Sequence, residues 1–175
     1  IGLPFSQYEK FIGGIKLMAI VDKPTDYFNT LLYSGNGSSG NAITGVGFAP
    51  NMVWMKKRDG TPNHYLWDTV RGVQKANTPN DNRAQSDQVN GLTAFGSDGF
   101  TVGSDGDVNS GNMVSWNWKE TADAGFDMIS YTGNGSSGRT ISHNLNAVPS
   151  MIWTKDLCNS EHWACYHKSL PAGYN

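Results

Sequence analysis

The sequence YSGNGSSG at residues 33–40 returns as YTGNGSSG at residues 131–138. A second pair follows, PNMVWMK at 50–56 and PSMIWTK at 149–155, after an insertion of one residue. Matches of this length at a constant spacing indicate an internal repeat, with a period of about 98 residues. Each copy starts with an aromatic-ended strand and a Gly-Asn-Gly turn, and continues through a Pro break into a strand that ends in Lys.

The regions between the matched blocks also carry strand signals. Residues 64–70 and 100–102 are rich in aromatic and β-branched side chains and follow turn sequences. Glycine is frequent, at 21 of 175 residues, and charged residues make up only 16%. Short strands with glycine turns and no convincing helix predict an all-β fold, an antiparallel β-sandwich or jelly roll.

The repeat divides the chain into three parts. Residues 1–24 are expected to be an N-terminal arm or to include a mistranslated leader, residues 1–17, ahead of a true start at Met18. Residues 25–124 are the first β-sandwich repeat, and residues 125–175 the first half of a second. Residues 73–90 are almost free of apolar side chains and are expected to be an exposed or poorly ordered excursion.

Tryptophan positions predict the core. Trp54 and Trp153 occupy equivalent strand positions in the two copies, as a repeated core site would. Residues 113–119 alternate, which places Trp116 and Trp118 together on an apolar face that we also expect to lie in the core.

Charge and hydropathy exclude some classes of partner. The formal net charge is −2 and the longest basic run is 56–58, so the sequence does not predict nucleic-acid binding. The chain has no run of about 18 apolar residues, so membrane insertion is not expected. Two cysteines are too few to hold the fold together.

Several motifs resemble the repeated β-sandwich domains of marine bacteriophage virion proteins, which are related in architecture to concanavalin A-like lectin and laminin-G folds. They are DYFNTLLYSGNG at 26–37, GVGFAPNMVWMK at 45–56, DTVRG at 68–72, GFTVG at 99–103, WNWK at 116–119 and WACYHKSL at 163–170. The resemblance implies a virion protein, assembled in the host cytoplasm and exposed outside the cell. The chain departs from the family at 142–146, where SHNLN replaces a turn of the form GHGLG.

Two functions follow from this setting. The first is a surface or tail-fibre-associated module that recognises host glycans without catalysis, and the second is a structural protein that decorates the capsid or cements an appendage. The expected partners are other virion proteins, a host surface glycan and further copies of the chain in a homo-oligomer. A glycan-degrading enzyme is disfavoured, because Glu9, Glu120 and Glu161 have no evident carboxylate partner, and no catalytic residue is predicted.

The candidate ligand-binding residues are Trp67, Arg71, Trp163 and His167. Trp67 and Trp163 leave turns beside polar neighbours and could stack on sugars, while Arg71 suits acidic glycans or pairs with Asp68 in a structural role.

Two further groups could bind metal. Asp105, Asp107 and Asn109 alternate in a way that can wrap Ca²⁺, although a simple polar turn explains the same residues. The second group, near the C-terminus, consists of Cys158, His162, Cys165 and His167. The four residues could bind zinc, or the two cysteines could form a disulfide hairpin. We expect instead that both cysteines are reduced thiols.

Overall fold

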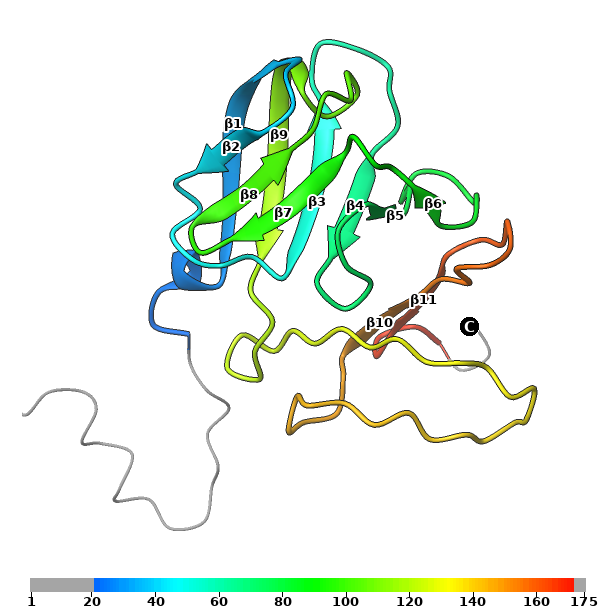
Figure 1. The fold of residues 1–175 in the computed structure, drawn as a ribbon. Coiled ribbons are helices and arrows are strands. Elements are labelled where there is room, and N and C mark those ends of the chain that lie inside the picture. The colour runs from blue at the N-terminus through cyan, green and yellow to red at the C-terminus, as the bar shows by residue number, and fades with distance from the viewer. Residues whose placement is uncertain (1–20, 172–175) are drawn as a thin grey trace, which may run out of the picture.

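A computed structural model of the protein describes residues 21–171 and shows an all-β fold (Figure 1). Within these residues the helical structure is limited to one short 3₁₀ turn, η2 (Pro24–Asp26). All strand pairs are antiparallel. The prediction of an all-β, antiparallel fold is therefore confirmed, whereas the hypotheses on Met18 and the N-terminal arm concern residues that lie mostly outside the described part.

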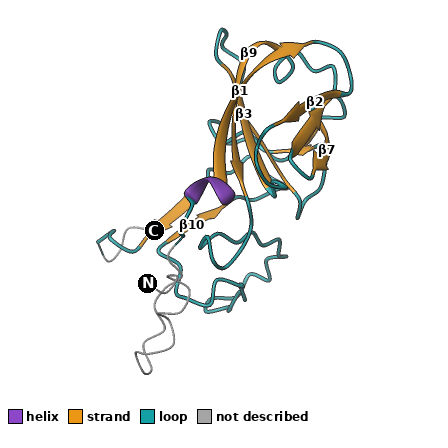
Figure 2. Ribbon diagram, turned by 90° about the vertical axis from the view of Figure 1, so that its left-hand side faces the viewer, coloured by secondary structure: helices purple, strands orange, loops and turns teal. Residues whose placement is uncertain are grey.

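Two sheets face each other in the first part of the chain (Figure 2). One sheet has the order β1-β9-β3-β4 and the other the order β2-β8-β7. The strands of the first are β1 (Phe28–Asn36), β9 (Ser110–Trp118), β3 (Met52–Lys57) and β4 (Tyr65–Asp68). The strands of the second are β2 (Asn41–Thr44), β8 (Gly99–Val102) and β7 (Leu92–Gly96). A small pair, β5 (Lys75–Ala76) and β6 (Ser86–Asp87), lies beyond β4.

The core fills the space between these sheets. The first sheet contributes Val53, Met55, Tyr65, Trp67 and Met113, and the second contributes Ile43, Leu92, Phe100 and Val102. Side chains from both sheets thus bury one another, which is the arrangement of a β-sandwich. Burial of so many large apolar groups is the main source of its stability.

Strand β9 directs its polar side chains toward the core, whereas we expected its tryptophans to lie there. Met113, Ser115 and Asn117 are fully buried, while Trp116 and Trp118 lie on the opposite face and are only partly buried. Burial of Asn117 is possible because its Nδ2 donates to Asn29 O and Ser115 Oγ, both at 3.1 Å. Aromatic side chains also cover part of the outer face, so hydropathy alone does not show which face meets the other sheet.

Trp54 also lies on the face opposite to the one that we predicted. Its neighbours Val53 and Met55 face the core, and Trp54 points to the outer face of the sheet. There it meets Trp116 and Trp153, with ring centroids 6.0 and 6.3 Å away. Trp153 itself is 50% exposed. The prediction of a repeated core site is therefore wrong, and these rings instead join the sandwich to the C-terminal segment.

The polar stretch 73–90 is more ordered than its composition suggests. Ala76, Asn77 and Thr78 are buried, and Asn77 exchanges two backbone hydrogen bonds with Leu66 of β4, at 2.9 and 3.0 Å. Main-chain bonds supply the order that apolar side chains do not. The expectation of an exposed or poorly ordered excursion is therefore wrong for this part of the stretch.

The C-terminal segment contains a hairpin with the register of an earlier one. Strand β10 (Met151–Thr154) pairs with β11 (Ala164–His167), Met151 opposite His167 and Thr154 opposite Ala164. In the β3–β4 hairpin Met52 lies opposite Asp68, and every pair recurs in β10–β11 exactly 99 residues later. A pair of lysine hydrogen bonds recurs as well. Lys56 Nζ donates to the backbone oxygens of Lys57 and Gly60. Lys155 Nζ donates in the same way to those of Asp156 and Asn159. Residues 127–150 contain no strand.

Candidate functional site

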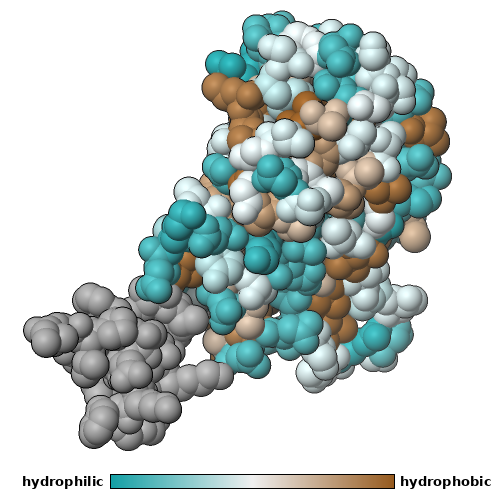
Figure 3. Space-filling model, turned by 60° about the vertical axis from the view of Figure 1, so that its left-hand side comes forward, coloured by the Kyte–Doolittle hydropathy of each residue, from teal (hydrophilic) through white to brown (hydrophobic). Residues whose placement is uncertain are grey.

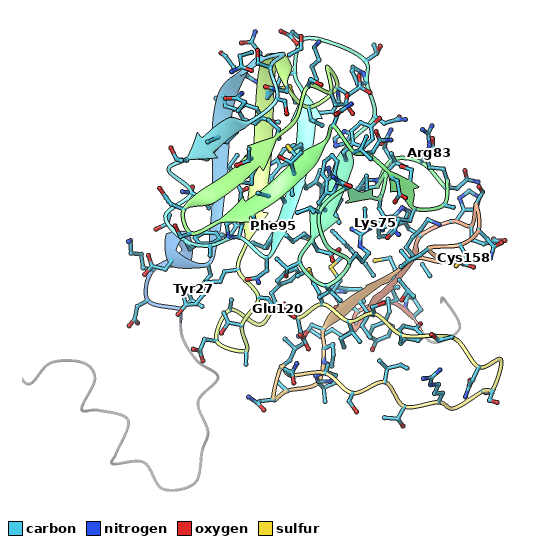
Figure 4. The ribbon with its side chains drawn as sticks, viewed as in Figure 1. Tyr27, Lys75, Arg83, Phe95, Glu120 and Cys158 are labelled. Carbon is cyan, nitrogen blue, oxygen red and sulfur yellow. The ribbon has the colours of Figure 1, made fainter. Side chains whose placement is uncertain are left out.

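An open groove of about 570 Å³ lies where the loop after β5 meets the hairpin β10–β11. Its lining combines one large aromatic side chain with polar groups, from Pro79, Asn80, Asp81, Asn82, His162 and Trp163. Figure 4 shows Arg83 and Cys158 on the two loops that approach each other at this side of the molecule. The groove is thus built by two segments that are about 80 residues apart in sequence.

Two hydrogen bonds hold these segments together. The backbone N–H of Gln85 donates to Leu157 O at 3.0 Å, and Asn82 Nδ2 donates to Ser160 O at 3.3 Å. These bonds fix the distance between the polar loop and the residues that precede β11. The groove is therefore formed without a ligand.

Asp81 carries the negative charge of the groove. Arg83 donates to its Oδ2 from Nε at 2.9 Å and from Nη2 at 2.6 Å. The Arg83 hydrogen bonds, helped by the backbone N–H of Asn82, lower the pKa of Asp81 from its ordinary value. The carboxylate is therefore ionised at neutral pH and acts as a hydrogen-bond acceptor.

Trp163 supplies the aromatic surface. Its side chain is partly buried, and its Nε1 finds no acceptor among the described residues. Buried indole N–H groups usually have a partner. Trp163 therefore offers its ring to the groove, while its Nε1 is itself buried.

A second hollow, of about 410 Å³, lies at the base of the sandwich. It is lined by Tyr27, Phe28, Trp118 and Phe126, with Lys119 Nζ 5.7 Å from the centre of the Tyr27 ring. Its walls are mainly apolar, so it offers fewer groups for orienting a polar ligand than the groove at Trp163.

Residues 23–175 match the family described as a domain of unknown function, DUF7483. The chain belongs to this family. No curated protein and no solved structure matches it. The described residues also contain no helix long and apolar enough to cross a membrane. The DUF7483 domain carries no assigned function.

Of the four predicted ligand-binding residues, only Trp163 lines the groove. Trp67 is fully buried in the core between the sheets and cannot reach a ligand at the surface. Arg71 pairs with Asp68 at 2.6 Å and also donates to Leu66 O, so the predicted structural pair is present and engages the guanidinium away from the groove. His167 lies on β11, outside the groove lining, and its Nδ1 accepts from the backbone N–H of Ser169.

The predicted calcium turn is occupied by its own hydrogen bonds. Asn109 is fully buried, and its Nδ2 donates to Ser38 O at 2.8 Å and Gly103 O at 2.6 Å. Burial raises the pKa of Tyr65 to about 12, and its protonated hydroxyl donates to Asp107 Oδ2 at 3.0 Å. Asp105 accepts from the Asp107 N–H. The three side chains therefore help to hold the loop, which is the role that a simple polar turn gives them.

The C-terminal cysteines do not pair with each other. Cys158 and Cys165 are both free and exposed. In the described part of the chain, no three His, Cys, Asp or Glu side chains gather in a way that could hold a metal ion.

The polar half of the groove is not evident from the sequence alone. Asn80, Asp81 and Asn82 belong to the stretch interpreted as an excursion, and His162 was considered only as a zinc ligand. The available signal was the concentration of amide and carboxylate groups after Pro79. Their proximity to Trp163 depends on long-range packing, which composition does not reveal.

Two carboxyl groups lie together where the chain leaves β9, at the Glu120 position labelled in Figure 4. Partial burial raises the pKa of Glu120, and the hydrogen-bonded Asp127 raises it further. Burial opposes ionisation of Asp127, but the N–H of Asn144, which donates to its Oδ2 at 2.6 Å, lowers the pKa of Asp127 overall. The main-chain N–H groups of Met128 and Asn144 donate to Glu120 and Asp127, respectively, and so help to hold both carboxyl groups in place.

Proposed function

We propose that this chain is a non-catalytic carbohydrate-binding module displayed on a bacteriophage particle. The observation that carries the proposal is the groove in which the Trp163 ring meets Asp81, Asn80 and Asn82. An aromatic face beside convergent polar groups is the composition that a sugar requires, because a sugar has apolar C–H faces and a rim of hydroxyls.

Each group has a defined role in this proposal. The Trp163 indole stacks against a sugar ring. Asp81 accepts hydroxyl hydrogens, and the Asn80 and Asn82 amides donate and accept. Since the net charge is only −2, short-range contacts and not long-range attraction select the ligand, which we expect to be a neutral glycan.

A single open groove of this kind binds weakly. The module would therefore act in many copies, with further virion proteins as its neighbours on the particle and host surface glycans as its target. Tail fibres and other surface appendages present such copies outside the cell after assembly in the host cytoplasm.

The resemblance to virion β-sandwich domains extends the proposal to the fold. In this interpretation the chain is a jelly-roll-like sandwich followed by the first half of a second copy at a period of about 98 residues. Support comes from the shared register of β3–β4 and β10–β11. The turn glycines support it too, since Gly37 and Gly135 have φ of 71° and 70°.

A glycan array probed with a multimerised chain tests the binding function. We expect signals on host-derived neutral glycans that Trp163→Ala abolishes and Tyr131→Ala preserves, because Tyr131 is an exposed aromatic residue outside the groove. Binding should be equal with calcium and with a chelator, since the side chains of residues 105–109 are engaged in internal hydrogen bonds. Silence across the array, or binding that Trp163→Ala leaves intact, would refute the assignment.

A structural virion protein is the second candidate. It is favoured by the large apolar side chains that the C-terminal segment exposes, namely Ile129, Tyr131, Val148, Met151, Ile152, Trp153, Tyr166 and Leu170. Exposed apolar groups that gather in one region indicate a protein interface. A silent glycan array together with stable association with purified phage particles would favour this candidate.

A further inference from the structure

The edge of β10 that does not face β11 has no strand beside it in the described structure. In the sandwich, the equivalent edge of β3 pairs with β9, which also pairs with β1. We propose that β10 and residues 126–134 together form an acceptor for one extended strand with the chemistry of β9. The inserted strand would run antiparallel to β10 and convert residues 126–134 into a strand on its other side.

The hairpin registers define where this strand would lie. Because the pairs of β3–β4 recur in β10–β11 after 99 residues, the free edge of β10 corresponds to the edge of β3 that β9 occupies. Trp54 lies opposite Trp116 of β9. By equivalence, Trp153 would lie opposite the matching tryptophan of the inserted strand.

Residues 126–134 have the sequence of a strand but not the conformation. They read FDMISYTGN, against FNTLLYSGN in β1, with phenylalanine, tyrosine, glycine and asparagine at matching positions. All nine residues of β1 are paired with β9, and β1 has no other neighbour in its sheet. An extended chain with unpaired main-chain groups does not persist as a strand alone. Among the described residues no strand pairs with 126–134 as β9 pairs with β1, and this segment is irregular.

Side chains that are buried in the sandwich are exposed in their C-terminal counterparts. Met52 and Val53 are 6% and 0% exposed, whereas Met151 and Ile152 are 50% and 46% exposed. Figure 3 shows apolar atoms reaching the surface in the lower part of the molecule, which contains this segment. The sequence keeps apolar residues at positions where this structure gives them little to bury against.

A glycine gives independent evidence. A Cβ on Gly35 would stand 2.1 Å from the Asn109 carbonyl carbon and the Ser110 nitrogen, because the start of β9 passes directly over it. The sequence repeat places Gly133 at the equivalent position, yet a Cβ there would meet nothing within 4 Å. Nothing in this structure therefore requires a glycine at position 133. A strand that followed the path of β9 would require one, because it would leave no room for a side chain there.

The occupant is specified by β9 itself. Its side chains alternate between two faces. Met113, Ser115 and Asn117 face the core, and Trp116 and Trp118 lie on the outer face. Pairing of two β10 edges from two copies would leave residues 126–134 without a partner and Gly133 without a function. An extended segment with alternating tryptophans would give residues 126–134 a partner strand and would account for the glycine at position 133.

The test uses the complete chain and a labelled synthetic peptide with the sequence of residues 108–119. We expect saturable binding in fluorescence anisotropy and new hydrogen-exchange protection in both 128–134 and 151–154. A scrambled peptide of the same composition, and a peptide with Val114→Pro that cannot complete the hydrogen-bond ladder, should not bind. Binding without protection of both segments overturns the proposal, as does the absence of binding.

Two pairs of chain variants locate the site. Gly133→Ala should weaken peptide binding by at least about tenfold through the clash that Gly35 reveals, with no change in the melting temperature of the free chain. Ser130→Ala, a nearby exposed position, should bind as the unmodified chain does. Ile152→Lys should also lose at least about tenfold, and Val89→Lys, an equally exposed apolar position elsewhere, should not.

The same variants separate the alternatives. Peptide binding that Gly133→Ala leaves unchanged would mean that the peptide displaces β9 or binds elsewhere, and would refute the acceptor. Self-association of the chain that Ile152→Lys abolishes, without any peptide binding, would identify a second copy as the occupant instead. Neither result depends on the glycan groove, because Trp163→Ala should leave peptide binding intact.

Discussion

Removal of the Asp68 carboxylate should destabilise the sandwich strongly. Asp68 and Arg71 have side chains that are only 10% and 8% exposed, and Arg71 Nε lies 2.6 Å from Asp68 Oδ2. Asp68 Oδ1 also accepts from the backbone N–H of Arg71 at 2.8 Å. Asp68→Ala leaves a buried guanidinium without its counter-charge, a change that costs about 3–5 kcal/mol in comparable pairs.

An exposed ion pair in the same chain supplies the control. Arg83 Nη2 also lies 2.6 Å from a carboxylate, that of Asp81, but the two side chains are 50% and 31% exposed. Asp81→Ala should therefore reduce the free energy of unfolding by no more than about 1 kcal/mol.

Urea unfolding followed by tryptophan fluorescence measures both variants. The double variant Asp68→Ala with Arg71→Ala should recover part of the loss, because it removes the unpaired charge as well. If Asp68→Ala and Asp81→Ala cost the same, burial does not determine the strength of these pairs and our assignment of Arg71 to a structural role fails.

Three further predictions concern stability. Trp67→Ala should cost about 3–5 kcal/mol in urea unfolding because it opens a core cavity, and Trp153→Ala should cost far less because that ring is half exposed; equal losses would contradict the core described here. Gly99→Ala should lower the free energy of unfolding by about 3 kcal/mol or more, because Gly99 has φ 152° and an added Cβ would stand 1.9 Å from Ile43 O. An unchanged melting temperature would show that the strands can separate there at little cost. Because the pKa of Glu120 is raised in the folded chain, protonation stabilises the fold: this contribution is complete below the ordinary value of 4.5 and is lost as pH rises through the folded pKa. Glu120→Gln should remove that dependence from pH-resolved melting curves, and an unchanged curve would exclude Glu120 as its source.

The local elements of this fold are readable from the sequence, because short-range signals determine them. Turn residues delimit β3, β4 and β8 in the chain, and the repeat identifies the hairpin β10–β11 by analogy with β3–β4. The Asp68–Arg71 pair was also predictable, since a separation of three residues across a turn brings the two side chains together.

The orientation of side chains was not readable in the same way. Alternation in β9 separates two faces, but it does not reveal that Ser115 and Asn117 face the core while Trp116 faces an added aromatic layer. That assignment depends on which surface the C-terminal segment covers. The groove had the same difficulty, because Asp81 and Trp163 come together only through tertiary hydrogen bonds such as that from Gln85 to Leu157.

The buried amide of Asn109 also determines how the top of the sandwich moves. Its Oδ1 accepts from the N–H of Asn36 and from Asn41 Nδ2, while its Nδ2 donates to the carbonyls of Ser38 and Gly103. The turn between β1 and β2 cannot open without exposing this amide, and the loop before β9 loses the same bonds. The two loops should therefore open as one cooperative unit, with a single opening free energy for their protected amides.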